Sequence, residues 1–289
     1  MSSTTGSRLI STSSSAAPRP SSTASTSSRW LRWSSARQST RSPRRSTRFP
    51  TTRRWRSVAV SEAVASAAMR EPISTYYGLL RRIHELRQPS LYVEIGVHEG
   101  HSLEFVQPGT RIVGVDPEPK VAKPPPHTTI VAQTSDDFFA GPEALGGATI
   151  DLAFADGLHW WEQTLRDVAN LERHSSPDGV ILIHDCNPID EVTAARERTT
   201  AVWSGDVWKT VVALRRFRPD LQVVVADVEP TGLAIVTGLD PTNTVIFDRY
   251  DEIVAEIDQL GWADIATADR SELLGLVAGD WADLRPLVA

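Results

Sequence analysis

The sequence lacks several features that mark common classes of protein. It has one cysteine, Cys186, among 289 residues, so an internal disulfide is impossible, and a reducing compartment fits this composition. No apolar run approaches the roughly 18 to 20 residues that a membrane-spanning helix needs, and no secretory signal sequence stands near the start. We therefore expect a soluble, cytoplasmic protein with no membrane partner.

Acidic side chains are absent from residues 1–57, which contain twelve arginines and no lysine. Setting these twelve aside leaves 18 of the 30 basic residues, against 36 acidic residues, for residues 58–289. A body with this excess of negative charge repels the phosphates of nucleic acids. We therefore expect the body of the protein to have no nucleic-acid partner.

Aliphatic residues are also scarce in residues 1–57, which consist largely of Ser, Thr, Arg and Pro. Such a segment cannot bury enough apolar surface to offset the entropy of ordering, so we expect it to be disordered. Three interpretations stay open. The segment is an organelle transit peptide, a basic arm for nucleic acid or anionic lipid, or the product of a start codon placed upstream of the true one.

Short apolar runs alternate with helical patterns over the rest of the chain, as in α/β proteins with a largely parallel sheet. A helical region is expected over 58–90, a sheet domain over 91–240 and a helical extension over 241–289. The last two strands are joined by too few residues for a parallel crossover, so they must be antiparallel. The prediction is a doubly wound, mostly parallel seven-stranded sheet with one antiparallel strand near its edge. Its strands fall at 90–96, 111–116, 128–133, 150–157, 180–188, 221–227 and 232–238.

A glycine motif follows the first predicted strand. It reads Glu94-x-Gly96-x-x-x-Gly100, and Asp116 ends the next strand. Glycines let the backbone turn sharply and approach a ligand, and an acid in the place of Asp116 can accept hydrogen bonds from both hydroxyls of a ribose. Because Glu94 would repel a pyrophosphate, the motif suits a ligand with a cationic amino group better than a dinucleotide.

Polar residues follow the fourth and fifth predicted strands, in the stretches "DLAFADGLHWWEQ" and "VILIHDCNP". A histidine such as His159 can accept a proton near neutral pH. Adjacent helix positions point about 100° apart, so Trp160 and Trp161 cannot both face the core. We expect one of them to pack on the sheet and the other to line an acceptor pocket. Cys186 is expected to be a packing residue, because nothing marks it as activated.

Taken together, "YVEIGVHEGHSL", "VGVDPEP" and the stretch from "DLAFADGLHWWEQ" to "HDCNP" resemble the class I S-adenosylmethionine-dependent methyltransferases, whose fold is Rossmann-like. More narrowly, they resemble the group with the metal-assisted macrolide-sugar and cephalosporin-type O-methyltransferases. The resemblance covers about residues 75–240. It implies methyl transfer from S-adenosylmethionine to a hydroxyl of a small molecule, such as a glycosylated natural product.

The resemblance also implies roles for individual residues. His159 is the general base, with Asp156 beside it in the catalytic set, and Asp156 also belongs to the cofactor site. Asp156, Asp185 and His184 are the candidate ligands of a divalent ion such as Mg²⁺ or Mn²⁺. The remaining cofactor residues lie around the methionine part, the ribose and the adenine of S-adenosylmethionine: Glu94, Gly96, Gly100, Ser102, Asp116, and Asp136 or its neighbour Asp137.

Several alternatives stay open. His184 stands where some relatives have a second acid, which favours Mn, Fe or Zn over Mg, or loss of the metal. Asp136 and Asp137 could instead cap a helix, Asp156 and His159 could begin one, and His184 could be a satisfied buried histidine. For the whole protein, the alternatives are a nicotinamide-dependent oxidoreductase of Rossmann type and a non-catalytic S-adenosylmethionine-binding protein. A homo-oligomer is also open.

Overall fold

A computed structural model describes residues 71–141 and 145–289. The prediction for residues 1–57, and the part of the predicted helical region that precedes residue 71, lie outside the described residues. Within them, the helical region contains α1 (Tyr76–Arg87), which Thr75 caps by accepting a hydrogen bond from the Gly78 N–H over 3.1 Å.

The described residues form one sheet with strands in the order β3-β2-β1-β4-β5-β7-β6-β8. Strands β1 to β5 run parallel to one another, and β7 runs antiparallel to both of its neighbours, β5 and β6. This confirms the α/β fold with its mostly parallel sheet and the antiparallel pairing of the last two predicted strands. The strands are β1 (Leu91–Ile95), β2 (Arg111–Val115), β3 (Thr128–Val131), β4 (Ile150–Ala155), β5 (Ser175–His184), β6 (Gln222–Asp227), β7 (Leu233–Thr237) and β8 (Leu276–Ala278).

The predicted count of seven strands is wrong, because the C-terminal extension adds β8 to the sheet. This strand pairs in parallel with β6, from Leu276 opposite Val225 to Ala278 opposite Asp227. It follows Gly275, whose left-handed backbone (φ 68°) ends the preceding helix. Three residues are too few to show the two-residue period of a strand, so only their pairing with β6 reveals them.

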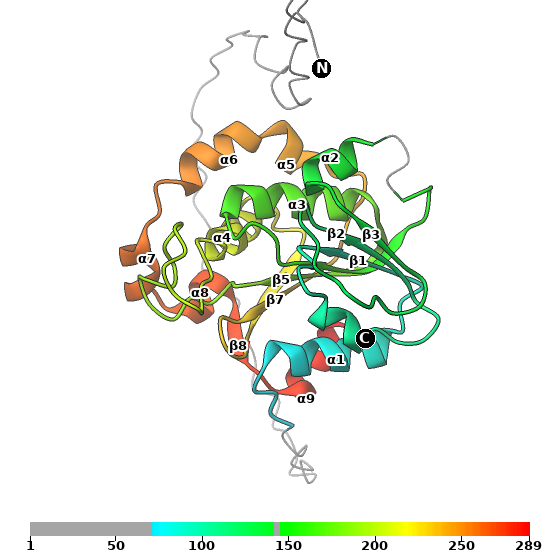
Figure 1. Cartoon of the computed structure of the whole chain (residues 1–289). Coiled ribbons are helices and arrows are strands. Elements are labelled where there is room, and N and C mark those ends of the chain that lie inside the picture. Colours follow the sequence, from blue (N-terminus) through cyan, green and yellow to red (C-terminus); the bar gives the residue numbers. More distant parts are fainter. Residues whose placement is uncertain (1–70, 142–144) are drawn as a thin grey trace, which may run out of the picture. The chain divides into compact units, whose positions relative to one another are not determined.

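Helices cover both faces of the sheet (Figure 1). On one face, α1 and α9 (Trp281–Leu284) bury Leu79, Ile83 and Leu284 against alternate residues of the central strands. On the other face lie α3 (Trp161–Arg173), α4 (Trp208–Phe217) and four shorter helices, α5 to α8. The helix α3 buries Trp161 in this core, and α4 buries Trp208. These shorter helices are α5 (Val245–Asp248), α6 (Tyr250–Ile257), α7 (Trp262–Thr267) and α8 (Arg270–Leu274).

Two short elements follow the outer strands. A single 3₁₀ segment, η2 (His101–Phe105), follows the glycine motif, and α2 (Ser135–Ala140) follows β3. A second 3₁₀ segment, η3 (Arg285–Leu287), follows α9. None of the helices in residues 71–141 and 145–289 has both the length and the apolar character needed to cross a membrane.

Candidate active site

A cavity of about 720 Å³ opens beside the carboxyl ends of the central strands. Residues that follow β1, β2, β4 and β5 line it, since parallel strands bring their carboxyl ends to one edge of the sheet. Apart from Asp136 and its neighbour Asp137, every candidate site residue from the sequence is on its wall: Glu94, Gly96, Gly100, Ser102, Asp116, Asp156, His159, His184 and Asp185.

The glycine turn brings the ends of β1 and β4 into close contact. Gly96 has a φ of 88°, and a Cβ atom there would lie 2.0 Å from the carbonyl oxygen of Asp156. Any other residue would therefore push the two strand ends apart. The same turn keeps the backbone at the cavity wall bare of side chains.

Glu94 is a buried carboxyl group at the end of β1. Tyr92 donates its phenolic hydrogen to Oε2 over 2.7 Å, and Ser102 donates its hydroxyl hydrogen to Oε1 over 2.5 Å. Burial raises the pKa of Glu94 to about 8, although both hydrogen bonds favour the charged form. The group therefore holds a proton at neutral pH and can become a counter-ion when a cation enters the cavity.

Asp116 connects the loops that follow β1 and β2 through hydrogen bonds. Its Oδ2 accepts a hydrogen bond from the His98 N–H and its Oδ1 one from the Glu118 N–H, both over 2.8 Å. Each carboxylate oxygen can accept more than one hydrogen bond, so capacity for a hydroxylated ligand remains.

Asp136 lies in the first turn of α2 but does not line the cavity. Its carboxylate faces Arg166, whose Nε is 3.3 Å from both oxygens. The cap of α2 is Thr134, which accepts a hydrogen bond from the Asp137 N–H over 3.2 Å. Neither acid is therefore placed at the cavity for a cofactor.

Asp167 of α3 is an acid at the cavity that sequence reasoning missed. It is 2% exposed, and its Oδ1 accepts hydrogen bonds from Ser135 Oγ over 2.5 Å and Gln163 Nε2 over 2.9 Å. Burial raises its pKa to about 6. In the sequence it resembles any polar residue of an amphipathic helix. The one signal was its place next to Val168 on the buried side of that helix.

Four side chains meet at the ends of β4 and β5. Asp185 Oδ2 lies 2.8 Å from His159 Nδ1 and 3.4 Å from His184 Nδ1. Asp156 Oδ1 lies 3.1 Å from His184 Nδ1 and 3.5 Å from His159 Nε2. We call these four residues the His–Asp cluster. The alternative that Asp156 and His159 merely begin a helix does not hold, because Asp206 Oδ1 accepts the hydrogen bond of the Trp161 N–H at the start of α3.

Opposite charges in the cluster stabilise one another. Burial opposes the positive charge of both histidines, but the carboxylates of Asp156 and Asp185 outweigh it. They raise the pKa of His184 to about 10 and the pKa of His159 above the ordinary value of 6.5. Burial likewise opposes the charge of Asp185, but the two histidines hold the pKa of Asp185 well below its usual range. Without a metal ion, the cluster therefore holds protons in its place.

The backbone of the cluster is in an uncommon conformation. His159 and Asp185 have φ angles of 59° and 64°, in the left-handed region that non-glycine residues rarely adopt. Gly205 packs beneath His159, and a Cβ atom there would lie 2.0 Å from the His159 carbonyl oxygen. Backbone strain of this kind persists only where the surroundings enforce it, and it gathers at functional sites.

The cluster is compatible with a divalent metal ion. Asp156, His184 and Asp185 each offer a ligand atom, and these atoms lie within 4.8 Å of one another. Asp185 Oδ2 is buried, and the groups that face it are the imidazoles of His159 and His184, at 2.8 and 3.4 Å. Two carboxylates with one imidazole suit Mn²⁺, Fe²⁺ or Zn²⁺ better than Mg²⁺.

Of the two expectations for Trp160 and Trp161, the one for packing on the sheet is right and the one for lining the pocket is wrong. Trp161 is fully buried against the sheet, whereas Trp160 is 40% exposed beneath the Arg196 guanidinium and does not line the cavity. The aromatic wall is instead Trp203, whose ring stacks on His159 with centroids 4.7 Å apart and planes at 6°. Cys186 is buried as a packing residue, as expected.

A family model of known proteins matches the part of the chain that lines the cavity. Residues 93–186 match a family model that is described as a methyltransferase domain, and these residues include all nine candidate residues that line the cavity. The chain carries a methyltransferase domain. This match confirms the expectation of a methyltransferase and disfavours the oxidoreductase alternative. No curated protein matches the chain significantly.

Solved structures of low sequence identity are similar to parts of the methyltransferase. The O-methyltransferase TomG from Streptomyces achromogenes, involved in tomaymycin synthesis and bound to SAM, is 17% identical over 56% of this chain and 78% of its own, with a TM-score of 0.43. An O-methyltransferase from Bacillus cereus in complex with SAH is 13% identical over 57% and 81%, with a TM-score of 0.44. The SAH-bound methyltransferase PaMTH1 from Podospora anserina is 16% identical over 57% and 78%, with a TM-score of 0.42.

Proposed function

We propose that the protein methylates a hydroxyl group of a small molecule, with S-adenosylmethionine as methyl donor. One observation carries the proposal: a single cavity joins the glycine turn, with Glu94 and Asp116, to the His–Asp cluster. The first part suits an amino-acid group and a ribose, and the second part suits a hydroxyl that must lose its proton. A cavity of this size holds both reactants.

The cofactor end follows from charge and shape. We assign the ammonium group of the methionine part to the neighbourhood of Glu94, and the ribose hydroxyls to Asp116. Gly96 and Gly100 leave room for the part of the cofactor between its ammonium group and its ribose. Ser102 holds the Glu94 carboxyl in place. We assign the adenine to Asp167 rather than Asp136, because only Asp167 lines the cavity.

The chemical end must deprotonate the acceptor. When bound, S-adenosylmethionine would supply an electrophilic methyl group, whose bond to sulfur breaks as the carbon–oxygen bond forms, so that S-adenosylhomocysteine leaves. The acceptor hydroxyl must lose its proton in this step. We assign this proton to His159. Its neutral imidazole can accept it, and Asp185 and Asp156 then stabilise the resulting cation.

A divalent ion would assist the same step. Asp156, Asp185 and His184 would hold it, and it would lower the pKa of a hydroxyl bound to it. His184 must first give up the proton that its carboxylate neighbours stabilise, so the ion and the proton compete for the cluster.

Calorimetric titration of the protein with S-adenosylhomocysteine, with and without Mn²⁺, tests the proposal. Micromolar binding that is lost in Asp116→Asn is the expected result. Binding of the cofactor without methyl transfer to any hydroxylated acceptor would favour the non-catalytic alternative. No binding at all would overturn the proposal.

A further inference from the structure

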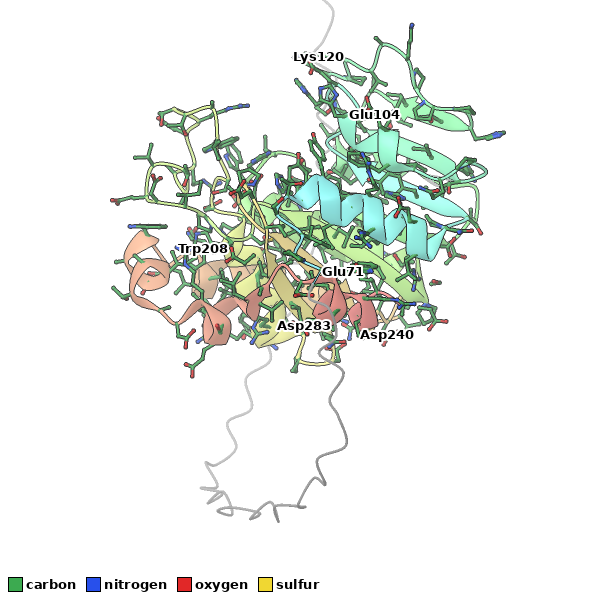
Figure 2. The ribbon with its side chains drawn as sticks, turned by 90° about the horizontal axis from the view of Figure 1, so that it is seen from below. Glu71, Glu104, Lys120, Trp208, Asp240 and Asp283 are labelled. Atoms are coloured by element: carbon green, nitrogen blue, oxygen red, sulfur yellow. The ribbon has the colours of Figure 1, made fainter. Side chains whose placement is uncertain are left out.

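Arg198 is the one lysine or arginine on the cavity wall among residues 71–141 and 145–289. The carboxyl groups on the same wall belong to Glu94, Glu99, Asp116, Asp156, Asp167 and Asp185. Arg198 belongs to the long segment between β5 and α4, the yellow-green chain that extends to the side in Figure 2. A lone permanent cation in an acidic cavity marks the place where an anionic group of a ligand can lie.

Among the described residues, no carboxylate forms an ion pair with Arg198. Its Nη2 donates to the Ala201 carbonyl oxygen over 3.2 Å and its Nε to that of Thr200 over 3.5 Å. Arg196 differs, because it lies 2.5 Å from Glu162 and 2.9 Å from Asp206. Arg196 thus fastens the segment to the start of α3, while Arg198 retains guanidinium hydrogens for a ligand.

The same segment supplies the flat wall beside the proposed base. Trp203 donates its indole hydrogen to the Ala195 carbonyl oxygen over 2.5 Å, which fixes the ring, and it stacks on His159. The Arg198 guanidinium carbon is 6.0 Å from the Trp203 ring centroid. Tyr76 and Tyr77, with ring centroids 4.2 Å apart, also line the cavity. A hydroxyl at His159 therefore belongs to a ligand that touches aromatic surface and lies within reach of a cation.

We propose that the acceptor is an aromatic hydroxy acid. Its ring lies against Tyr76 and Tyr77, its hydroxyl faces His159, and its carboxylate pairs with Arg198 beside Trp203. Aromatic stacking and a charge-assisted pair to a guanidinium are the two interactions that these side chains offer. The proposal rests on the proposed function and narrows its acceptor to one chemical class.

A pair of probes that differ only in charge tests the proposal. The protein, saturated with S-adenosylhomocysteine, is titrated with 4-hydroxybenzoate and separately with 4-hydroxybenzamide. We expect the acid to bind about three- to fivefold more tightly than the amide, as for an ion pair to an exposed arginine. Arg198→Gln should remove this preference and Arg198→Lys should keep part of it. Arg173→Gln is the matched control, because Arg173 also lies over an aromatic ring, that of Phe247, but not at the cavity.

Equal affinity of the wild-type protein for acid and amide, or binding of neither to the loaded protein, overturns the proposal. If Arg198→Gln instead weakens binding of S-adenosylhomocysteine, the arginine serves the carboxylate of the cofactor, and the assignment to the acceptor is wrong. Failure of the wild-type protein to bind S-adenosylhomocysteine contradicts the proposed function itself, so the two failures are distinguishable.

Discussion

The Nδ1 atom of His159 lies 2.8 Å from Oδ2 of Asp185, although the two residues follow different strands of the sheet. This contact fixes the imidazole between a carboxylate and the ring of Trp203. It also determines when the imidazole is neutral, and thus when it can accept a proton. The expectations for the proposed base depend on this pair.

Replacement of His159 by glutamine should lower kcat by about 10²- to 10⁴-fold, because a general base contributes that much to a proton transfer. Affinity for S-adenosylhomocysteine should stay within about twofold of the wild type. In the wild-type protein, the acidic limb of the pH profile of kcat should lie above pH 6.5, since Asp185 and Asp156 raise the pKa of His159 above that value. His174→Gln, outside the cavity, should change none of these quantities. Normal turnover in His159→Gln would show that the base lies elsewhere.

A divalent ion should stabilise the protein through the His–Asp cluster. With Mn²⁺ at 100 times its dissociation constant, the free energy of unfolding should rise by about 2.7 kcal/mol, measured by thermal denaturation. Asp185→Asn and Asp156→Asn should both remove the effect. Asp116→Asn should keep it while it loses cofactor binding. A Mn²⁺ effect that survives both cluster substitutions would place the ion outside the cluster.

Substitution of Gly205 by alanine should lower kcat, in addition to the loss of stability that its left-handed backbone conformation causes. At Gly205 (φ 55°) the new Cβ meets the His159 carbonyl oxygen at 2.0 Å, so His159 must move. At Gly146, with a similar φ of 62°, no described atom lies within 4 Å. Both variants should lose about 1 kcal/mol of stability from the left-handed backbone, but only Gly205→Ala should also lower kcat. Equal kcat in the two variants would contradict the expected displacement of His159.

Asp167 and Asp136 can be compared as candidate partners of the adenine amine. The wild-type protein should bind S-adenosylhomocysteine more tightly than its inosine analogue, which has an oxygen in place of the amino group. Asp167→Asn should reduce this preference about tenfold or more, because an amide can donate to that oxygen. Asp136→Asn, whose carboxylate faces Arg166 outside the cavity, should leave the preference unchanged. The reverse pattern would restore the assignment made from the sequence.

Binding of S-adenosylhomocysteine at pH 7 should release a proton from Glu94. The pKa of the free carboxyl is raised to about 8, so it is mostly protonated at pH 7, and an ammonium group beside it would lower that pKa. Calorimetry in buffers of different ionisation enthalpy measures the release. It should fall as the pH rises above 8, and it should be absent in Glu94→Gln at every pH. Equal release in wild type and variant would assign the proton to another group.

The sequence by itself determined the parallel core of the sheet and the residues at its carboxyl ends. Apolar runs of strand length, separated by helical patterns, permit few arrangements other than a doubly wound sheet. Because parallel strands end at the same edge, Glu94, Asp116, Asp156 and Asp185 were predictable as neighbours before any coordinates.

Only the tertiary structure decided which polar residues face the cavity. Asp136 and Asp167 both contact Gln163, yet one turns toward Arg166 and the other toward the cavity. Trp203 and Arg198 lie in an irregular segment without periodicity, so no sequence pattern placed them beside His159. The strand β8 is recognised only by its pairing with the edge of β6. Strand ends are fixed by local hydrophobic pattern, whereas side-chain direction and loop position depend on packing between residues far apart in the chain.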